Sequence, residues 1–149
     1  MAGEQFASRS GATLKDLLLA LEDRRLDAEA LVAAGRFVSS IAMGVYALEI
    51  CLKVTICQRL DLDYLPKGFE FHHLPGLLTL SGQSRRLGKD LAMNTHWRMA
   101  EIYADKLSIL RYSPQPGIDR KQAESFHHSM FDRTAGLIPW FKRHLPRNI

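Results

Sequence analysis

One long apolar segment, residues 36–59, constrains the fold of this chain more than any other feature. It reads RFVSSIAMGVYALEICLKVTICQR, and between its terminal arginines only Glu49 and Lys53 carry charge. Apolar side chains recur at intervals of three and four, as in a helix. They occupy every face, which predicts a helix surrounded by protein rather than a surface helix. Two charges near its middle argue against a membrane span. We therefore expect the central helix of a soluble bundle.

The segment before it has the signals of an amphipathic helix. Thr13 and Asp16 have the spacing of a capping box. A stripe of apolar residues then continues to about Ala34, and Gly35 supplies a left-handed stop. Because the turn between the two segments is so short, we expect residues 14–34 and the central helix to form an antiparallel hairpin.

The rest of the chain predicts further helices, separated by glycine and proline. After a loop over residues 61–70, we expect a short helix over 74–81, a second short helix within 83–93, a helix over 96–110 capped by Thr95, and a last helix over 120–144 capped by Asp119 and kinked at Pro139. No segment alternates with the period of a strand. The expected class is all-α, an antiparallel bundle of four to five main helices.

Length and composition are consistent with one intracellular domain. A chain of 149 residues usually builds one core. We expect a flexible N-terminus over residues 1–12, a single domain over 13–145 and a C-terminal tail over 146–149. The N-terminal sequence has no apolar signal region. The only two cysteines, Cys51 and Cys57, point to different sides of one helix and are expected to be free, buried thiols. We infer a cytoplasmic location and no membrane association.

Positive charge is concentrated in the C-terminal half. Residues 1–84 hold eight Lys/Arg and ten Asp/Glu, a net charge of −2, whereas residues 85–149 hold twelve and six, a net charge of +6. Such a half is compatible with binding a phosphate backbone or an acidic partner. An arginine-rich solvated surface explains the same surplus, because the charges form no continuous run. Both interpretations remain open on charge alone.

Several short motifs together resemble those of HEPN-domain proteins. The motifs are Gly44-x-Tyr46-Ala47-x-Glu49-x-x-Leu52-Lys53, Phe71-His72-x-Leu74 and Arg111-Tyr112, and the resemblance covers roughly residues 14–141. The family often has His-Asp-Leu where this chain has His72-His73-Leu74, so a carboxylate that can cap a helix is missing. The resemblance implies an antiparallel helical bundle, usually a homodimer. It also implies a prokaryotic toxin–antitoxin or defence setting, often beside a nucleotidyltransferase.

Many members of that family are metal-independent ribonucleases, which implies a candidate catalytic pair here. Their signature is an arginine, four to six residues and a histidine, and two copies meet across a dimer. Arg120 and His127 match it, with six residues between them at the start of the last expected helix. Seven residues span two turns, so both side chains lie on one face. Histidine can transfer protons and arginine can stabilise charge on a phosphate. The alternative is a pair of exposed polar residues on an amphipathic helix.

A second candidate set has binding rather than catalytic chemistry. Glu49 and Lys53 have the favourable order of an i, i+4 ion pair, and burial requires that they be partnered or face a cavity. They either line a cleft or dimer seam with Arg111 and the Arg120/His127 face, or form a structural pair. Arg111 either contacts phosphate or pairs with Glu49. Tyr112 and His72, from the same family motifs, complete this candidate binding set.

No metal site or cofactor is expected. The adjacent pairs His72/His73 and His127/His128 lack the usual spacing of metal ligands, and the chain has no glycine-rich phosphate loop. Three functions therefore compete. The first is a noncatalytic component that binds RNA, a nucleotide or a nucleotidyltransferase partner, and we rank it highest. The second is a metal-independent ribonuclease that uses Arg120 and His127, and the third is a structural oligomerisation subunit.

Overall fold

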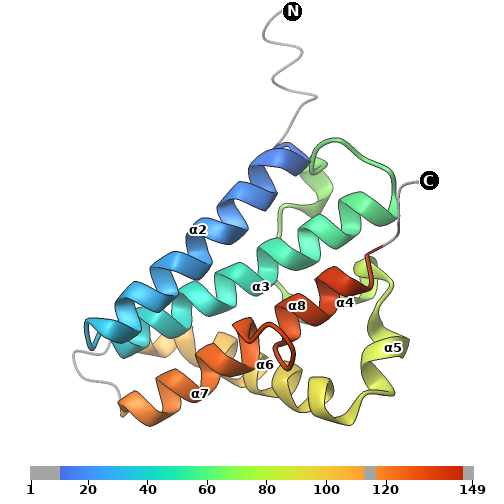
Figure 1. Cartoon of the computed structure of the whole chain (residues 1–149). Coiled ribbons are helices and arrows are strands. Elements are labelled where there is room, and N and C mark those ends of the chain that lie inside the picture. The colour runs from blue at the N-terminus through green and yellow to red at the C-terminus, as the bar shows by residue number, and fades with distance from the viewer. Residues whose placement is uncertain (1–10, 113–116, 146–149) are drawn as a thin grey trace, which may run out of the picture.

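The computed structural model describes residues 11–112 and 117–145, and this part of the chain is helical (Figure 1). It contains seven α-helices and one 3-10 turn: α2 (Leu14–Ala33), α3 (Phe37–Arg59), η1 (Lys67–Phe69), α4 (Leu74–Ser81), α5 (Ser84–Gly88), α6 (Leu91–Leu110), α7 (Arg120–Phe131) and α8 (Leu137–Arg143). Within the described ranges the only β pairing is one isolated bridge, between Thr13 and Tyr64. The all-α class is therefore confirmed. The expected termini, residues 1–12 and 146–149, lie almost wholly outside the described residues.

The first hairpin forms as predicted. The Thr13 hydroxyl accepts a hydrogen bond from the Asp16 amide at 3.1 Å, and the Asp16 carboxylate accepts one from the Thr13 amide at 3.3 Å. This capping box starts α2. Gly35 has a φ of 75°, the left-handed conformation that glycine adopts without strain. The chain reverses there, and α2 and α3 run side by side in opposite directions (Figure 1).

Helix α3 is the core of the bundle. It packs against α2, α4, α6, α7 and α8, and fourteen of its 23 residues are buried. By length and hydropathy it would pass as a membrane span, but other helices bury 78% of its apolar stretch. Its apolar composition is therefore accounted for by its central position. Cys51 and Cys57 are both buried and free, as predicted.

Helix α6 begins earlier than the sequence pattern indicated. We expected Thr95 to cap a helix that starts at residue 96, but α6 starts at Leu91 and Asp90 is its cap. The Asp90 carboxylate accepts a hydrogen bond from the Met93 amide at 3.1 Å. Thr95 lies inside the helix, where its hydroxyl donates to the Leu91 carbonyl oxygen. The prediction failed because Asp90 and Thr95 are both good capping residues.

The expected last helix over 120–144 is two helices, so that prediction was wrong. Helix α7 ends at Phe131, and the Asp132 carboxylate accepts hydrogen bonds from the amides of Thr134 and Ala135 in the turn that follows. Gly136 allows this tight turn, because a Cβ there would lie 2.5 Å from the Asp132 carbonyl oxygen. Pro139 does not kink a continuous helix. It lies in the first turn of α8, where the missing amide hydrogen is tolerated.

Candidate functional site

The candidate catalytic pair lies on α7, and both side chains are involved in packing against the first hairpin. Arg120 donates a hydrogen bond at 3.2 Å to the Val32 carbonyl oxygen at the end of α2, which also accepts from the Gly35 amide at 3.0 Å. Its guanidinium also lies over the Phe37 ring, 5.0 Å from the ring centre. It makes a looser ion pair with Glu124, at 3.6 Å. Arg120 therefore ties α7 to the turn between α2 and α3.

His127 is half-buried, and its ring lies 4.8 Å from that of Phe131. Its Nδ1 atom is buried without a hydrogen-bond partner in the described part of the chain. Burial lowers the pKa of His127, which favours the neutral ring at neutral pH. Glu29 and Arg25 of α2 exert smaller and opposite effects on the same pKa, so this ring also faces α2. The pair shares one side of α7, as predicted from its spacing.

Glu49 interacts with a histidine rather than with the lysine one turn away. The residues Glu49 and Lys53 are 8% and 9% exposed. Glu49 Oε2 lies 2.9 Å from Nδ1 of His72, whose side chain is mostly exposed. Burial raises the pKa of Glu49, while the hydrogen bond to His72 and the charge of Lys53 oppose that shift. The expected direct pair with Lys53 is not among the ion pairs of the described residues.

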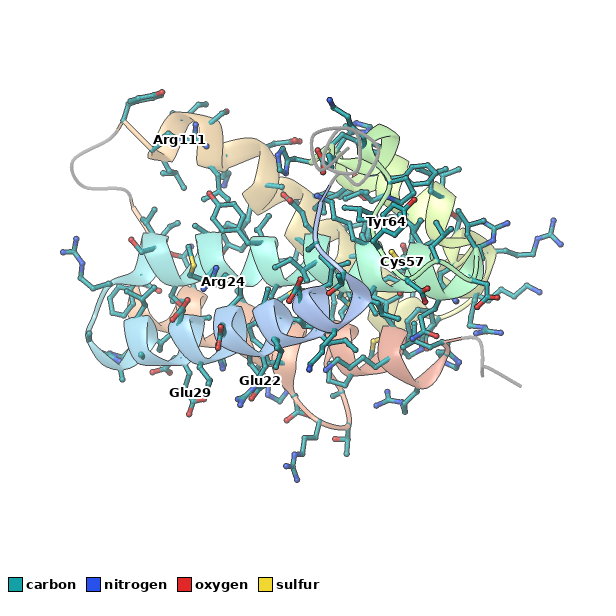
Figure 2. All side chains as sticks on the ribbon, turned by 90° about the horizontal axis from the view of Figure 1, so that it is seen from above. Glu22, Arg24, Glu29, Cys57, Tyr64 and Arg111 are labelled. Atoms are coloured by element: carbon teal, nitrogen blue, oxygen red, sulfur yellow. The ribbon has the colours of Figure 1, made fainter. Side chains whose placement is uncertain are left out.

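Arg111 and Tyr112 lie at the outer end of α6 (Figure 2), and both are exposed. Tyr112 is 82% exposed. No ion pair joins Arg111 to Glu49 within the described ranges. Glu49 contacts His72 in the segment before α4. Arg120 instead contacts Val32 at the end of α2. The structure therefore brings Glu49 and His72 of the predicted binding set together, but it does not gather Arg111, Arg120 or His127 with them.

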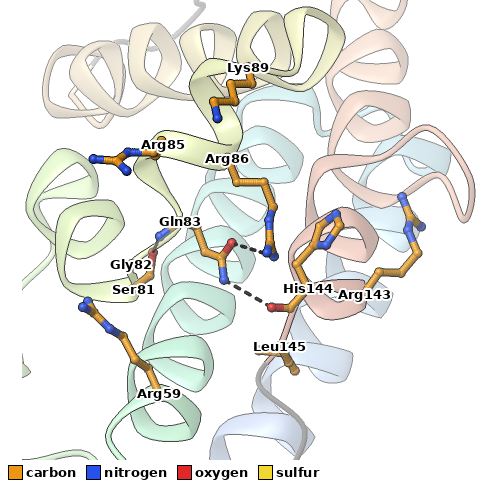
Figure 3. Close-up of a pocket in the computed structure, with 10 residues that line it drawn as sticks. All are labelled: Arg59, Ser81, Gly82, Gln83, Arg85, Arg86, Lys89, Arg143, His144 and Leu145. Atoms are coloured by element: carbon orange, nitrogen blue, oxygen red, sulfur yellow. Dashed lines mark hydrogen bonds between the residues drawn. The ribbon is translucent and has the colours of Figure 1, made fainter.

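A different cavity gathers five cationic side chains. Its volume is about 730 Å³, and it lies where the ends of α3, α4 and α8 meet α5 (Figure 3). We call it the basic pocket. The side chains of Arg59, Arg85, Arg86, Lys89 and Arg143 line it, together with Ser81, Gly82, Gln83, His144 and Leu145. No carboxylate belongs to these ten described residues.

Some of these cations also shape the pocket. Arg59 donates to the Leu80 carbonyl oxygen at 2.8 Å, at the end of α4. Gly82 is left-handed with a φ of 75°, and a Cβ there would lie 3.0 Å from the Arg59 guanidinium. Arg143 donates to carbonyl oxygens of the turn between α7 and α8. These two arginines are therefore held in place by backbone groups rather than neutralised by acids.

Gln83 connects the two sides of the pocket. Its side-chain amide donates to the His144 carbonyl oxygen at 3.2 Å, and its amide oxygen accepts from Arg86 at 3.4 Å (Figure 3). In contrast, the side chains of Arg85 and Lys89 make no hydrogen bond or ion pair with the described residues. The pocket thus contains a fixed framework and two cations, Arg85 and Lys89, that have no partner among the residues the structure describes.

His144 has the electrostatics expected beside several cations. Burial lowers its pKa, and the nearby charges of Arg86 and Arg143 lower it further, whereas Asp90 opposes them. Asp90 does not neutralise the pocket freely, because its carboxylate caps α6. The His144 ring also packs edge-on against Trp140, 4.7 Å between ring centres. An anion bound among these side chains would favour the protonated imidazole.

Sequence reasoning missed the pocket because its residues come from distant segments, near positions 59, 81–89 and 143–145. The excess of positive charge after residue 84 was the available signal, and it did not identify a location. Carboxylate-free clusters of arginine suit phosphate and other oxyanions, which arginine binds in bidentate geometry. No group of three metal-ligating side chains converges in the part of the chain that the structure describes.

The comparisons with known proteins add no relative: no family model, curated protein or solved structure matches this chain.

Proposed function

We propose that this chain is a noncatalytic binding module that holds the phosphates of RNA or of a nucleotide in the basic pocket. The observation that carries the proposal is the convergence of five cationic side chains from three helical segments in one cavity without a lining carboxylate. Folding brings like charges together at an electrostatic cost. A bound polyanion would offset that cost, which makes the cluster more informative than the net charge.

The arrangement favours phosphate over a carboxylate-bearing peptide. Guanidinium groups come from α3, α5 and α8, so one ligand could contact cations from three helical segments. A phosphodiester chain presents one negative charge per nucleotide and can satisfy several cations at once. A cavity of about 730 Å³ is also of the size that encloses a small organic ligand such as a nucleotide.

The residues that line the pocket suit the binding of phosphates better than the cleavage of RNA. Cleavage of RNA by general acid–base catalysis needs one group to accept a proton and another to donate one. His144 is the sole histidine among the lining residues, burial lowers its pKa, and no lining carboxylate can share the task. The candidate pair Arg120 and His127 already has packing contacts with Val32, Phe37 and Phe131. The resemblance to HEPN-domain proteins is compatible with this proposal, since that family includes noncatalytic members.

The test measures the affinity for a labelled single-stranded RNA by fluorescence anisotropy. In the key variant, Arg85, Arg86 and Lys89 are all changed to Ala. Charged hydrogen bonds contribute about 1.5–3 kcal/mol each, so losing only part of three contacts is expected to weaken binding on the order of a hundred-fold. A nucleoside triphosphate, tested in competition, would show whether a free nucleotide occupies the same pocket.

A matched control removes the same charge elsewhere. Lys15, Lys106 and Lys121 are exposed and lie outside the pocket, so changing all three to Ala is expected to weaken binding only a few-fold through long-range electrostatics. Equal losses in the two triple variants would refute a localised site. RNA cleavage in EDTA by the wild type but not by His127→Ala would instead establish the ribonuclease alternative.

A further inference from the structure

Helix α6 carries a regular stripe on its outward face. Positions spaced alternately by four and three residues form it: Leu91, Thr95, Arg98, Ile102, Asp105 and Ile109 on the helix, and Tyr112 just beyond its end at Leu110. This is the 3.5-residue repeat by which one helix packs along another. The inward face of α6 lies about half a turn away and buries Met93, Trp97 and Ala100. The stripe therefore points away from the core of this bundle.

Large apolar side chains on this stripe are unusually exposed. Leu91 is 84% exposed, Tyr112 82% and Ile109 70%, which are the three highest values among the large hydrophobic residues described. Ile102, at the middle of the stripe, is 54% exposed. Single exposed apolar residues are common, but four on one helical repeat, with Leu91 near one end, Ile102 at the middle and the other two towards the opposite end, indicate a partner.

The charges on the stripe identify a second copy of this chain as that partner. Arg98 and Asp105 are equidistant from the point midway between residues 101 and 102, and so are Leu91 and Tyr112. A two-fold axis at that point, with the helices antiparallel, brings Arg98 of each copy opposite Asp105 of the other. The same axis brings Leu91 opposite Tyr112, and the two Ile102 side chains together. The surface is thus complementary to itself, as a two-fold interface requires.

We propose that two copies of this chain associate through antiparallel packing of their α6 helices. Neither Arg98 nor Asp105 makes a side-chain hydrogen bond or ion pair with the described residues of its own chain. Both are therefore available for two symmetric ion pairs around a small apolar centre. The proposal goes beyond the resemblance to a dimeric family, because it specifies the helix, the orientation and the register.

The dimer would also place the two basic pockets usefully. Lys89 of the pocket lies two residues before α6 begins. In an antiparallel pair the two pockets would therefore lie near opposite ends of a helix pair, about 30 Å long for 20 residues. One RNA strand of sufficient length could engage both, which raises the apparent affinity through effective concentration. This consequence rests on the proposed function, whereas the dimer itself does not.

Sedimentation velocity across the micromolar range, without nucleic acid, tests the dimer. Arg98→Glu alone and Asp105→Arg alone each create two like-charge contacts, so each is expected to weaken dimerisation at least about tenfold. The double variant Arg98→Glu/Asp105→Arg restores both ion pairs with reversed polarity and is expected to restore the dimer. In a parallel pair, Arg98 would meet Arg98, and this pattern of loss and rescue would not occur.

Cysteine cross-linking provides an independent test of the register. Both native cysteines are buried, so an introduced surface cysteine dominates oxidation. Ile102→Cys is expected to form a disulfide-linked dimer rapidly, because the two side chains meet at the axis. Leu19→Cys on α2 is a matched control, with Leu19 58% and Ile102 54% exposed, and is expected to cross-link much more slowly. A wild type that stays monomeric, or failure of the double charge variant to restore dimerisation, would overturn the proposal.

Discussion

The face of α7 that carries Arg120 and His127 and the basic pocket differ in how their polar side chains are used. On α7, Arg120 donates to a carbonyl of α2 and stacks on Phe37, and His127 packs on Phe131 with a buried ring nitrogen. In the basic pocket, Arg85 and Lys89 make no such contact with the described residues. The first region matches a sequence motif, and the second matches none.

This difference shows what a short motif can and cannot predict. The spacing of Arg120 and His127 correctly placed both on one side of a helix, but that side packs against α2. A residue with a structural task has less freedom to contact a ligand, whereas an unpaired cation near like charges has an electrostatic reason to do so. Substitutions in the two regions are therefore expected to separate effects on stability from effects on RNA binding.

The largest effect is expected from Gly82→Ala in the wall of the pocket. The φ of 75° is unfavourable for alanine, and the new Cβ would lie 3.0 Å from the Arg59 guanidinium. We expect the free energy of unfolding to fall by about 1–3 kcal/mol and RNA affinity to fall as Arg59 is displaced. Urea denaturation measures the first effect. Gly88→Ala, where a Cβ would meet nothing within 4 Å, is the control and should leave stability nearly unchanged.

Arg120→Ala is expected to affect stability but not RNA binding. It removes the hydrogen bond to Val32 and the contact with Phe37, which together contribute about 1 kcal/mol for a half-exposed side chain. Lys121→Ala, on an exposed neighbour, is the matched control. Thermal or urea unfolding and RNA titration, performed on the same samples, separate the two effects. A marked loss of RNA affinity in Arg120→Ala at unchanged stability would show that the α7 face, rather than the basic pocket, binds RNA.

A smaller effect is expected in the pH dependence of RNA affinity. Burial and the nearby arginines lower the pKa of free His144, and a bound phosphodiester would raise it by favouring the charged ring. Affinity should therefore increase a few-fold as pH falls from 7.5 towards 5. His144→Gln is expected to flatten this profile. An unchanged profile in that variant would place the bound phosphates away from His144.

The smallest effect concerns His127 and the stability of the fold at mildly acidic pH. Because its pKa is lowered in the folded state, the folded protein binds fewer protons than the unfolded chain near that pKa. Its cost to stability is absent above the unfolded pKa of about 6.5 and grows as pH falls below it. We expect His127→Phe to lose less stability than the wild type between pH 7 and 5. Urea denaturation at each pH is the measurement, and parallel profiles would contradict it.

The helical elements could be predicted wherever a single local signal dominated. Thr13 and Asp16 start α2 as a capping box, and Gly35 and Gly82 end their helices in the left-handed conformation. The predictions were wrong for the start of α6 and the end of α7, because two local sequence signals competed at each boundary. Asp90 and Thr95 are alternative caps for α6, and the turn at Asp132 preceded the proline that we expected to kink a continuous helix.

The candidate site was less predictable than the fold, because it depends on contacts between distant segments. Glu49 and His72 are 23 residues apart in sequence, so the i, i+4 relation of Glu49 to Lys53 gave the wrong partner. His73 performs the capping role that we assigned to the missing aspartate, since its Nδ1 accepts from the Gly76 amide at 3.2 Å. The basic pocket combines the ends of four helical segments, and no local pattern encodes that combination.

The salt dependence of RNA affinity tests most directly whether the basic pocket binds phosphates. It is measured for the wild type and for the variant with Arg85, Arg86 and Lys89 all changed to Ala. For single-stranded nucleic acid, each phosphate contact contributes about −0.7 to the slope of log affinity against log salt concentration. If these three cations hold phosphates, the variant's slope should be shallower by about 2, while Arg120→Ala keeps the wild-type slope. An unchanged slope in the triple variant, or a loss in Arg120→Ala instead, would contradict the central claim that the pocket is the binding site.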